Sequence, residues 1–124
     1  MAGLTQARQQ AILDTEFPTS GSTDHIAYST NGSSENTAII TSRTAIGATG
    51  WASATAASPS VKANNALLTS ATAATSGTIT HFAIFSASTG GTQKTDWTAL
   101  AASRTPAIGD TLTWAIGALS VTLD

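Results

Sequence analysis

The sequence lacks cysteine, and only 10% of its 124 residues are charged. The absence of cysteine excludes a disulfide framework and a thiolate metal site. No apolar run approaches the ~18 residues of a membrane-spanning helix, so no membrane partner is expected. The N-terminus has no basic segment followed by an apolar stretch, which predicts no signal peptide. A formal net charge of -2 with five scattered Lys and Arg residues excludes nucleic acid as an expected partner.

Ala, Thr and Ser make up much of what remains, and aromatic residues reach only 6%. The length fits one domain. Disordered chains usually combine high net charge with low hydrophobicity, and this chain has neither. A soluble monomer usually carries more surface charge. The composition therefore favours a folded protein whose surface is largely covered by neighbouring molecules.

One helix is expected near the N-terminus, in a helical segment spanning residues 1–18. Good helix formers follow Leu4, with Thr5 as a candidate N-cap. Phe17-Pro18 predicts the end of the helix, because a residue before proline avoids the helical region. Leu4, Ala7, Ala11 and either Leu13 or Ile12 fall near one face at helical spacing. Such a face covers either the core of its own domain or a neighbouring subunit, and the sequence leaves both open.

Alternating patterns predict strands over residues 24–30 and 79–85, and one or two short strands are expected within residues 36–46. Asn31-Gly32 predicts a tight turn after the first of them. The segment 79–85 carries large apolar side chains on both faces, which predicts a central strand. Residues 52–74, nearly all Ala, Ser, Thr and Asn, are expected to be extended. A further strand is expected over residues 95–100.

The C-terminus predicts a hairpin, with 112–116 and 119–123 alternating about Gly117-Ala118. The resulting fold class is all-β: a single-domain antiparallel β-sandwich or jelly roll of about seven or eight strands with a short N-terminal helix. The predicted division is a helical segment at 1–18 and a β-sandwich domain at 19–124. Trp114 is the main expected core anchor. The full set of expected core anchors is Ile79, Phe82, Phe85, Leu112, Trp114 and Val121.

No chemistry-bearing motif is found. His81 alternates with apolar residues and has no ligand-spaced partner, so we expect a hydrogen-bonded structural histidine. Asp24 and His25 are adjacent in an expected strand, and their side chains would point to opposite faces. The nucleophile elbow, the phosphate loop and the dinucleotide fingerprint are all absent. The sequence predicts no enzyme, no catalytic residues, no metal and no cofactor.

Tryptophan is enriched at interface hot spots, so Trp51 and Trp97 are either core residues or anchors against a partner. Lys94 and Asp96 beside Trp97 could form an exposed contact patch. The expected partner-interface residues are Leu4, Ile12, Phe17, Trp51 and Trp97.

Two segments carry a family resemblance: THFAIFSASTGG at residues 80–91 and GDTLTWAIGALSVTL at residues 109–123. With the preceding short helix, their order and spacing resemble a group of small structural proteins of tailed bacteriophages. The resemblance is best after Gly77, whereas residues 52–74 share only the small-residue character. Members of this group are described as capsid decoration (cement) proteins or as minor tail and tail-fibre proteins, and none is known for catalysis.

The resemblance implies a virion structural protein made in the bacterial host cytoplasm. The leading interpretation is a capsid decoration protein that binds the major capsid protein and copies of itself, as a homotrimer, on the outer capsid. The alternative is a minor tail or tail-fibre component. A third interpretation is a carbohydrate-binding module for host surfaces, in which Trp51, Trp97 and Tyr28 stack on sugar rings. The number of copies per virion distinguishes a capsid decoration protein from a tail component, because the first is expected in much higher copy number.

Overall fold

The computed structural model describes residues 3–123, so residues 1, 2 and 124 of the predicted segments lie outside the described residues. The described chain forms two compact units. The first combines residues 3–22, 46–67 and 114–123, and the second combines residues 23–45 and 68–113. Both units are therefore built from segments far apart in the sequence. The helical N-terminus belongs to the first unit.

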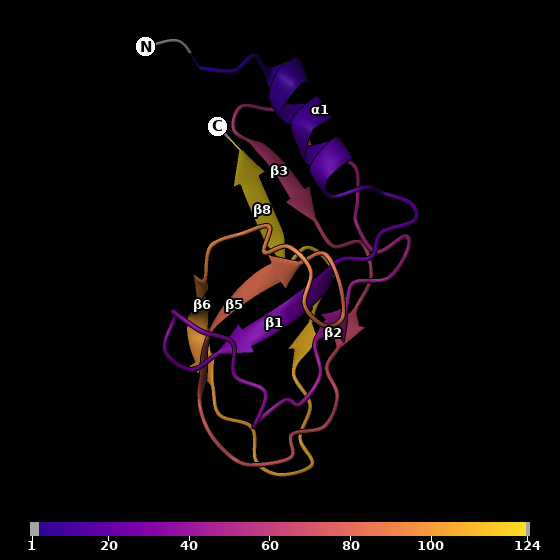
Figure 1. Cartoon of the computed structure of the whole chain (residues 1–124). Helices are drawn as coiled ribbons and strands as arrows, with labels where there is room; N and C mark the ends of the chain where they lie inside the picture. The colour runs from indigo at the N-terminus through magenta and orange to yellow at the C-terminus, as the bar shows by residue number, and fades with distance from the viewer. Residues whose placement is uncertain (1–2, 124) are drawn as a thin grey trace. The chain divides into compact units, whose positions relative to one another are not determined.

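The first unit contains the helix α1 (Gln6–Glu16). Thr5 is its N-cap and accepts a long 3.4 Å hydrogen bond from the Arg8 N–H, and the helix ends at Phe17, so both predicted ends are confirmed. The predicted packing face is wrong for Ala7 and Ala11, which are exposed, whereas Leu13 is buried together with Gln9. Figure 1 shows α1 alongside β3 (Ser60–Ala63) and β8 (Ser120–Leu123), which pair antiparallel in the same unit.

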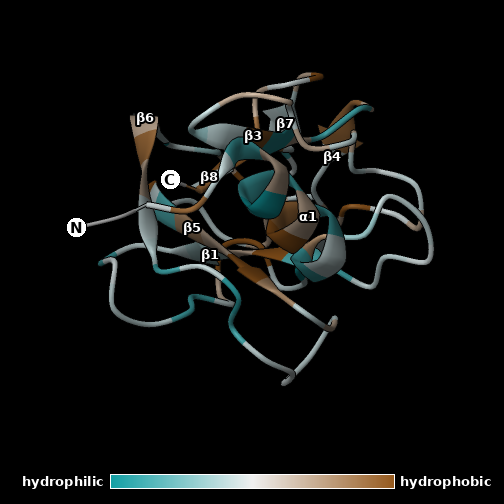
Figure 2. Cartoon of the chain, turned by 90° about the horizontal axis from the view of Figure 1, so that it is seen from above, coloured by the Kyte–Doolittle hydropathy of each residue, from teal (hydrophilic) through white to brown (hydrophobic). Residues whose placement is uncertain are grey.

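The second unit is organised by a four-stranded antiparallel sheet in the order β2-β1-β5-β6. Its strands are β1 (His25–Ser29), β2 (Thr44–Ala45), β5 (Ile79–Phe85) and β6 (Thr98–Arg104). The prediction that 79–85 is a central strand is confirmed, with β1 and β6 on either side. The register places Ala27 opposite Ala83, and both are fully buried. Figure 2 shows hydrophobic residues along β1 and β5.

The C-terminal hairpin is the clearest error of the sequence-based prediction. β8 pairs with β3, and β7 (Thr113–Trp114) pairs with β4 (Leu68–Thr69), so the two expected arms do not pair with each other. Asn64 supplies a physical reason. Its amide donates to the Ala115 carbonyl at 3.0 Å, and its Oδ1 accepts from the Leu119 N–H at 3.0 Å. The buried Asn64 thus fixes the turn between the arms and directs β8 to β3.

The turn predicted at Asn31-Gly32 is confirmed. The Asn31 Oδ1 accepts the backbone N–H groups of Ser33 and Ser34 at 2.9 and 3.1 Å, which is the local bonding that favours Asn in turns. Gly32 has φ 75°, a left-handed conformation, and an added Cβ would lie 2.8 Å from the His81 ring. Glycine is therefore required at this position by both the backbone and the close approach.

The predicted fold class is confirmed: residues 3–123 hold eight strands in antiparallel sheets and one short helix at the N-terminal end. The segment 52–74 is extended as expected and contributes β3 and β4. Of the one or two short strands expected within 36–46, the structure has one, β2, with two residues. The strand expected over 95–100 begins and ends later in the chain, as β6 (Thr98–Arg104). Short, turn-rich strands of this kind are typical of sandwich folds.

Candidate interaction surfaces

Leu4 and Ile12, two of the expected partner-interface residues, are exposed. They are 44% and 45% accessible, and Ile12 lies on the solvent side of α1. A shallow hollow beside Ile12 is lined by Arg8, Ala11 and Thr15. The helix therefore offers a small apolar surface bordered by polar groups.

Phe17 and Trp51 are placed differently from the prediction that they contact a partner. They are 3% and 1% exposed, and their rings meet edge to face with centroids 5.2 Å apart. Both residues therefore lie in the core of the first unit, where no partner can reach them without opening the unit. Burial of two large aromatic side chains here provides much of the apolar area of a unit that has few large residues.

The stacking of sugars on Trp51, Trp97 and Tyr28 is likewise not supported by their positions. Tyr28 is 1% exposed, and its hydroxyl lies 2.6 Å from the Thr44 Oγ1. Trp97 is half-buried and packs against Phe85 with ring centroids 5.9 Å apart. Trp97 alone among the three retains an accessible surface, and it does not form a platform with the others.

The expected core anchors fall into two groups by exposure. Ile79, Phe82 and Leu112 are buried, at 0%, 9% and 7% exposed. Phe85, Trp114 and Val121 are half-buried. The alternating pattern therefore identified the correct segments. It overestimated the burial of Phe85, Trp114 and Val121.

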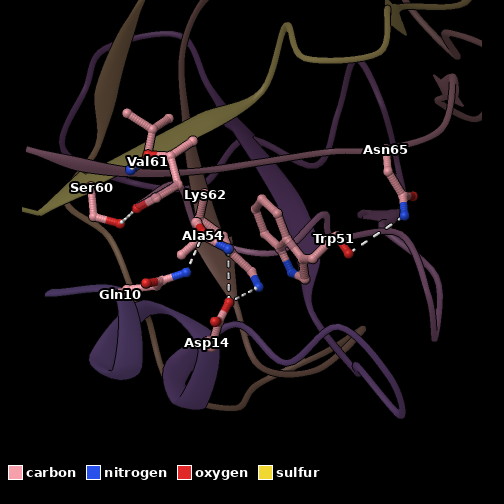
Figure 3. Close-up of polar contacts among 9 residues, drawn as sticks. Gln10, Asp14, Trp51, Ala54, Ser60, Val61, Lys62 and Asn65 are labelled. Carbon is pink, nitrogen blue, oxygen red and sulfur yellow. Dashed lines mark hydrogen bonds and ion pairs between the residues drawn. The ribbon is translucent and has the colours of Figure 1, made fainter. Parts of the chain in front are cut away.

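The contact between α1 and β3 is polar, and sequence reasoning missed it. The Lys62 side chain on β3 is fully buried, and its ammonium donates to the Asp14 Oδ1 at 2.7 Å (Figure 3). The same oxygen accepts the Ala54 N–H at 2.8 Å, and the Gln10 side chain donates to the Ala54 carbonyl at 3.1 Å. Figure 3 shows the Trp51 ring beside the Lys62 chain. The aliphatic stem of Lys62 thus lies in the core while its charged end reaches the helix.

Gln9 completes this contact. It is 2% exposed, its Nε2 donates to the Ser58 Oγ at 3.1 Å, and its Oε1 accepts the Ser60 N–H at 3.1 Å. These bonds satisfy buried polar groups that would otherwise destabilise the fold. The sequence offers little indication that Gln9 is buried, because glutamine is a good helix former that is also common on exposed helix faces.

Asp14 has a shifted pKa. Partial burial raises its pKa, but hydrogen bonds from Lys62 and from the Ala54 N–H, with the charge of Lys62, outweigh burial and hold the pKa below its ordinary value of 3.8. A carboxyl whose folded-state pKa is depressed stabilises the fold above the unfolded pKa, and this stabilisation is lost as pH falls through the folded pKa.

We therefore predict that the difference in unfolding free energy between the wild type and Asp14→Asn is largest at neutral pH. It should shrink as pH falls below about 4, where wild-type Asp14 also becomes neutral. Urea unfolding of both proteins from pH 7 to pH 2.5 measures this difference. An unchanged difference across that range would show that the Asp14 charge does not stabilise the helix contact.

Arg43 forms a second network missed from the sequence, in the second unit. Its guanidinium binds both carboxylate oxygens of Glu35, at 2.8 and 2.9 Å. Its Nη1 also donates to the carbonyls of Ala87 and Gly90 at 2.9 and 2.8 Å. The Arg43 Cζ lies 4.0 Å from the Phe85 ring centroid. Such a bidentate, ring-stacked arginine fixes two loops to each other.

Lys94 does not belong to the exposed patch suggested by its neighbours. Its ammonium lies 2.7 Å from the Asp24 Oδ1, and the Asp24 side chain is 1% exposed. The Lys94 side chain is itself only 14% exposed. Lys94 therefore forms an ion pair with a buried carboxylate inside the unit. Asp96 remains exposed beside Trp97.

The titratable groups form no reactive arrangement among the described residues. The His81 Nδ1 lies 2.8 Å from the Thr80 Oγ1, and the His25 Nδ1 lies 2.7 Å from the Thr23 carbonyl. No three His, Asp or Glu side chains within residues 3–123 converge as metal ligands. Within the same residues, α1 is too short and too polar to span a membrane.

The comparison with protein families gives one match over nearly the whole chain. The family model described as "Podophage GP4 fiber I protein gp80" matches residues 7–122, from α1 through β8. No curated protein matches the chain.

Proposed function

The chain belongs to the family of the podophage GP4 fiber I protein gp80, and from this membership we propose that it is a component of a bacteriophage tail fibre. The membership confirms the resemblance drawn from the sequence: this is a phage virion structural protein of tail-fibre-like type. Its place is therefore in the virion. The tail-fibre alternative becomes the leading interpretation, and capsid decoration becomes the alternative.

The single observation that carries the proposal is the extent of the family match, which covers both compact units rather than one. The composition supports the same role. A chain with 10% charged residues is suited to an assembly in which neighbours cover much of its surface. We propose that the chain acts by binding copies of itself and adjacent virion proteins, with no reaction and no cofactor assigned to it.

The contact networks support a structural role in the assembled particle. The Asp14–Lys62 contact attaches the helix to its sheet, and Arg43 ties two loops together. Both networks fix segments far apart in the sequence, which limits the loss of conformational entropy when a partner binds. Leu4, just before α1, and Ile12, on α1, remain the predicted contacts with an adjacent virion protein.

The test is position and copy number in purified virions. We expect immunogold labelling at the tail, and quantitative mass spectrometry should give on the order of tens of copies per particle, set by the symmetry of the tail. The matched control is the major capsid protein of the same particles, which calibrates the count. Labelling over the whole head with hundreds of copies would instead support capsid decoration, and absence from purified virions would overturn both.

A further inference from the structure

The Ser29 hydroxyl, at the end of β1, binds the turn that follows the strand. It accepts the backbone N–H of Asn31 at 3.2 Å and that of Gly32 at 2.9 Å. It also donates to the Asn31 Oδ1 at 3.1 Å. Ser29 is 0% exposed, whereas Asn31 is exposed. A buried serine therefore fixes both the main chain and the side chain of an exposed Asn-Gly pair.

Asn-Gly is the dipeptide in which an asparagine is most easily converted to an acid, and Asn31-Gly32 is the only such pair in the chain. The glycine nitrogen loses its proton to a solvent base and attacks the asparagine Cγ. The bond from Cγ to the amide nitrogen breaks, and this nitrogen leaves as ammonia. Water then opens the resulting succinimide ring at one carbonyl to give aspartate, or at the other to give isoaspartate. Glycine favours the attack because it has no side chain to hinder the approach.

We propose that Asn31 is a deamidation site that the Ser29 hydroxyl keeps closed. The nucleophile of the reaction is the Gly32 nitrogen, whose proton is donated to the Ser29 Oγ at 2.9 Å. Breaking this hydrogen bond leaves a buried hydroxyl without one of its partners, which is unfavourable. While the bond holds, the nitrogen keeps its proton and its orientation, so it cannot attack the Asn31 Cγ.

The carbon that would be attacked, in contrast, is already polarised. The Asn31 Oδ1 accepts the N–H groups of Ser33 and Ser34 at 2.9 and 3.1 Å. Donors in these positions stabilise the negative charge that develops on the oxygen as the nitrogen attacks. The turn therefore activates the carbon and withholds the nitrogen. Ser29 is thus the positioning residue on which the rate depends.

Deamidation at Asn31 would disturb the sheet of the second unit. Isoaspartate lengthens the main chain by a carbon atom directly before Gly32. There is little room for this, because an added Cβ on Gly32 would lie 2.8 Å from the His81 Nε2 on β5. Ser29 and His81 face each other in the pairing of β1 with β5. Protection of Asn31 therefore preserves the turn beside the two central strands of the sheet.

The experiment measures the rate of deamidation at Asn31 in the full chain, folded in buffer and unfolded in urea at the same mildly alkaline pH. Peptide mapping by mass spectrometry follows the appearance of aspartate and isoaspartate. We expect the folded wild type to react about tenfold or more slowly than the unfolded chain, and folded Ser29→Ala to lose most of this protection. The matched control is Ser33→Ala, which removes another hydroxyl bound to the Asn31 Oδ1, at 3.2 Å, and should react like the wild type.

Amide hydrogen exchange followed by NMR separates this role of Ser29 from a general loosening of the turn. Exchange at Gly32 begins with loss of the same proton as deamidation. Ser29→Ala should therefore accelerate exchange at Gly32 about tenfold or more, in parallel with deamidation. The N–H groups of Ser33 and Ser34 keep their bonds to the Asn31 Oδ1, so they should exchange as in the wild type.

A folded wild type that deamidates as fast as the unfolded chain would overturn the proposal, whether or not Ser29→Ala folds. So would a folded Ser29→Ala that reacts like the wild type, or a Ser33→Ala that reacts as fast as Ser29→Ala. Equal acceleration of exchange at Gly32 and at the two serines after it would also contradict the role of Ser29. Circular dichroism verifies the fold of each variant. Position and copy number in the virion do not enter these results, so the proposal can fail while the tail-fibre function stands.

Discussion

Replacing Trp51 with alanine is expected to lower the free energy of unfolding by about 3–5 kcal/mol. Trp51 is 1% exposed and contacts the Phe17 ring edge to face, so truncation removes a large buried surface and leaves a cavity. The isolated bridge between Trp51 and Asn64 also fixes the backbone here, which limits collapse around the cavity. Chemical denaturation monitored by circular dichroism measures the change.

Trp114→Ala is the matched control, because it removes the same side chain from a half-buried site in the same unit. Its cost should be about 1–2 kcal/mol, since less apolar area leaves water when the protein folds. If Trp114→Ala were the more destabilising of the two, Trp51 would not be the anchor of the first unit. The comparison also tests the sequence-based choice of Trp114 as the main core anchor.

The difference between these tryptophans shows where sequence reasoning succeeds and where it stops. Trp114 stands in a clear alternating pattern, which identifies a strand but not how deeply each face is covered. Trp51 stands between small residues without any period, so nothing local predicts that Phe17, far away in the sequence, packs on it. Depth of burial depends on contacts between distant segments, which a local pattern does not contain.

Strand positions could be predicted better than strand partners. The bounds of β5 follow from the alternation of 79–85, and the Asn31-Gly32 turn follows from backbone chemistry. The partner of β8 could not be found in this way. A short turn at Gly117 favours pairing of its two flanking segments, but the side chain of Asn64 binds Ala115 and Leu119 and overrides that preference. These bonds come from a residue distant in sequence, and a local pattern around Gly117 does not contain them.

The candidate surfaces were predicted only in part, for the same reason. The expected helix face pointed to Leu4 and Ile12, which are exposed. Its position among small polar residues pointed to Trp97, which is half-buried, but the same argument also selected Trp51, which is buried. The attachment of α1 through Lys62 could not be predicted, because an isolated lysine in a sequence is usually exposed to solvent. Only the structure shows that Lys62 is buried and paired with Asp14.

Replacing Asp14 with alanine is expected to lower the free energy of unfolding by about 2–3 kcal/mol. Breaking a buried ion pair costs roughly 3–5 kcal/mol when one charge is left inside the protein. The Lys62 side chain is 0% exposed, but that of Asp14 is 37% exposed, so nearby water reduces the expected cost. Thermal and urea unfolding measure the change. Loss of the Ala54 N–H partner adds to it, and Asp14→Asn, which keeps an acceptor oxygen, separates the two contributions.

Removing the other partner should have a smaller effect. Lys62→Met retains most of the buried stem and leaves behind an aspartate that water can reach, so the expected cost is below about 1 kcal/mol. In the double variant Asp14→Ala/Lys62→Met no charge remains in the interior, and its stability should exceed that of Asp14→Ala alone. The double-mutant cycle therefore gives a favourable coupling between the two residues. Additive losses would mean that the ion pair does not hold α1 to β3, and that the burial of Leu13 alone does.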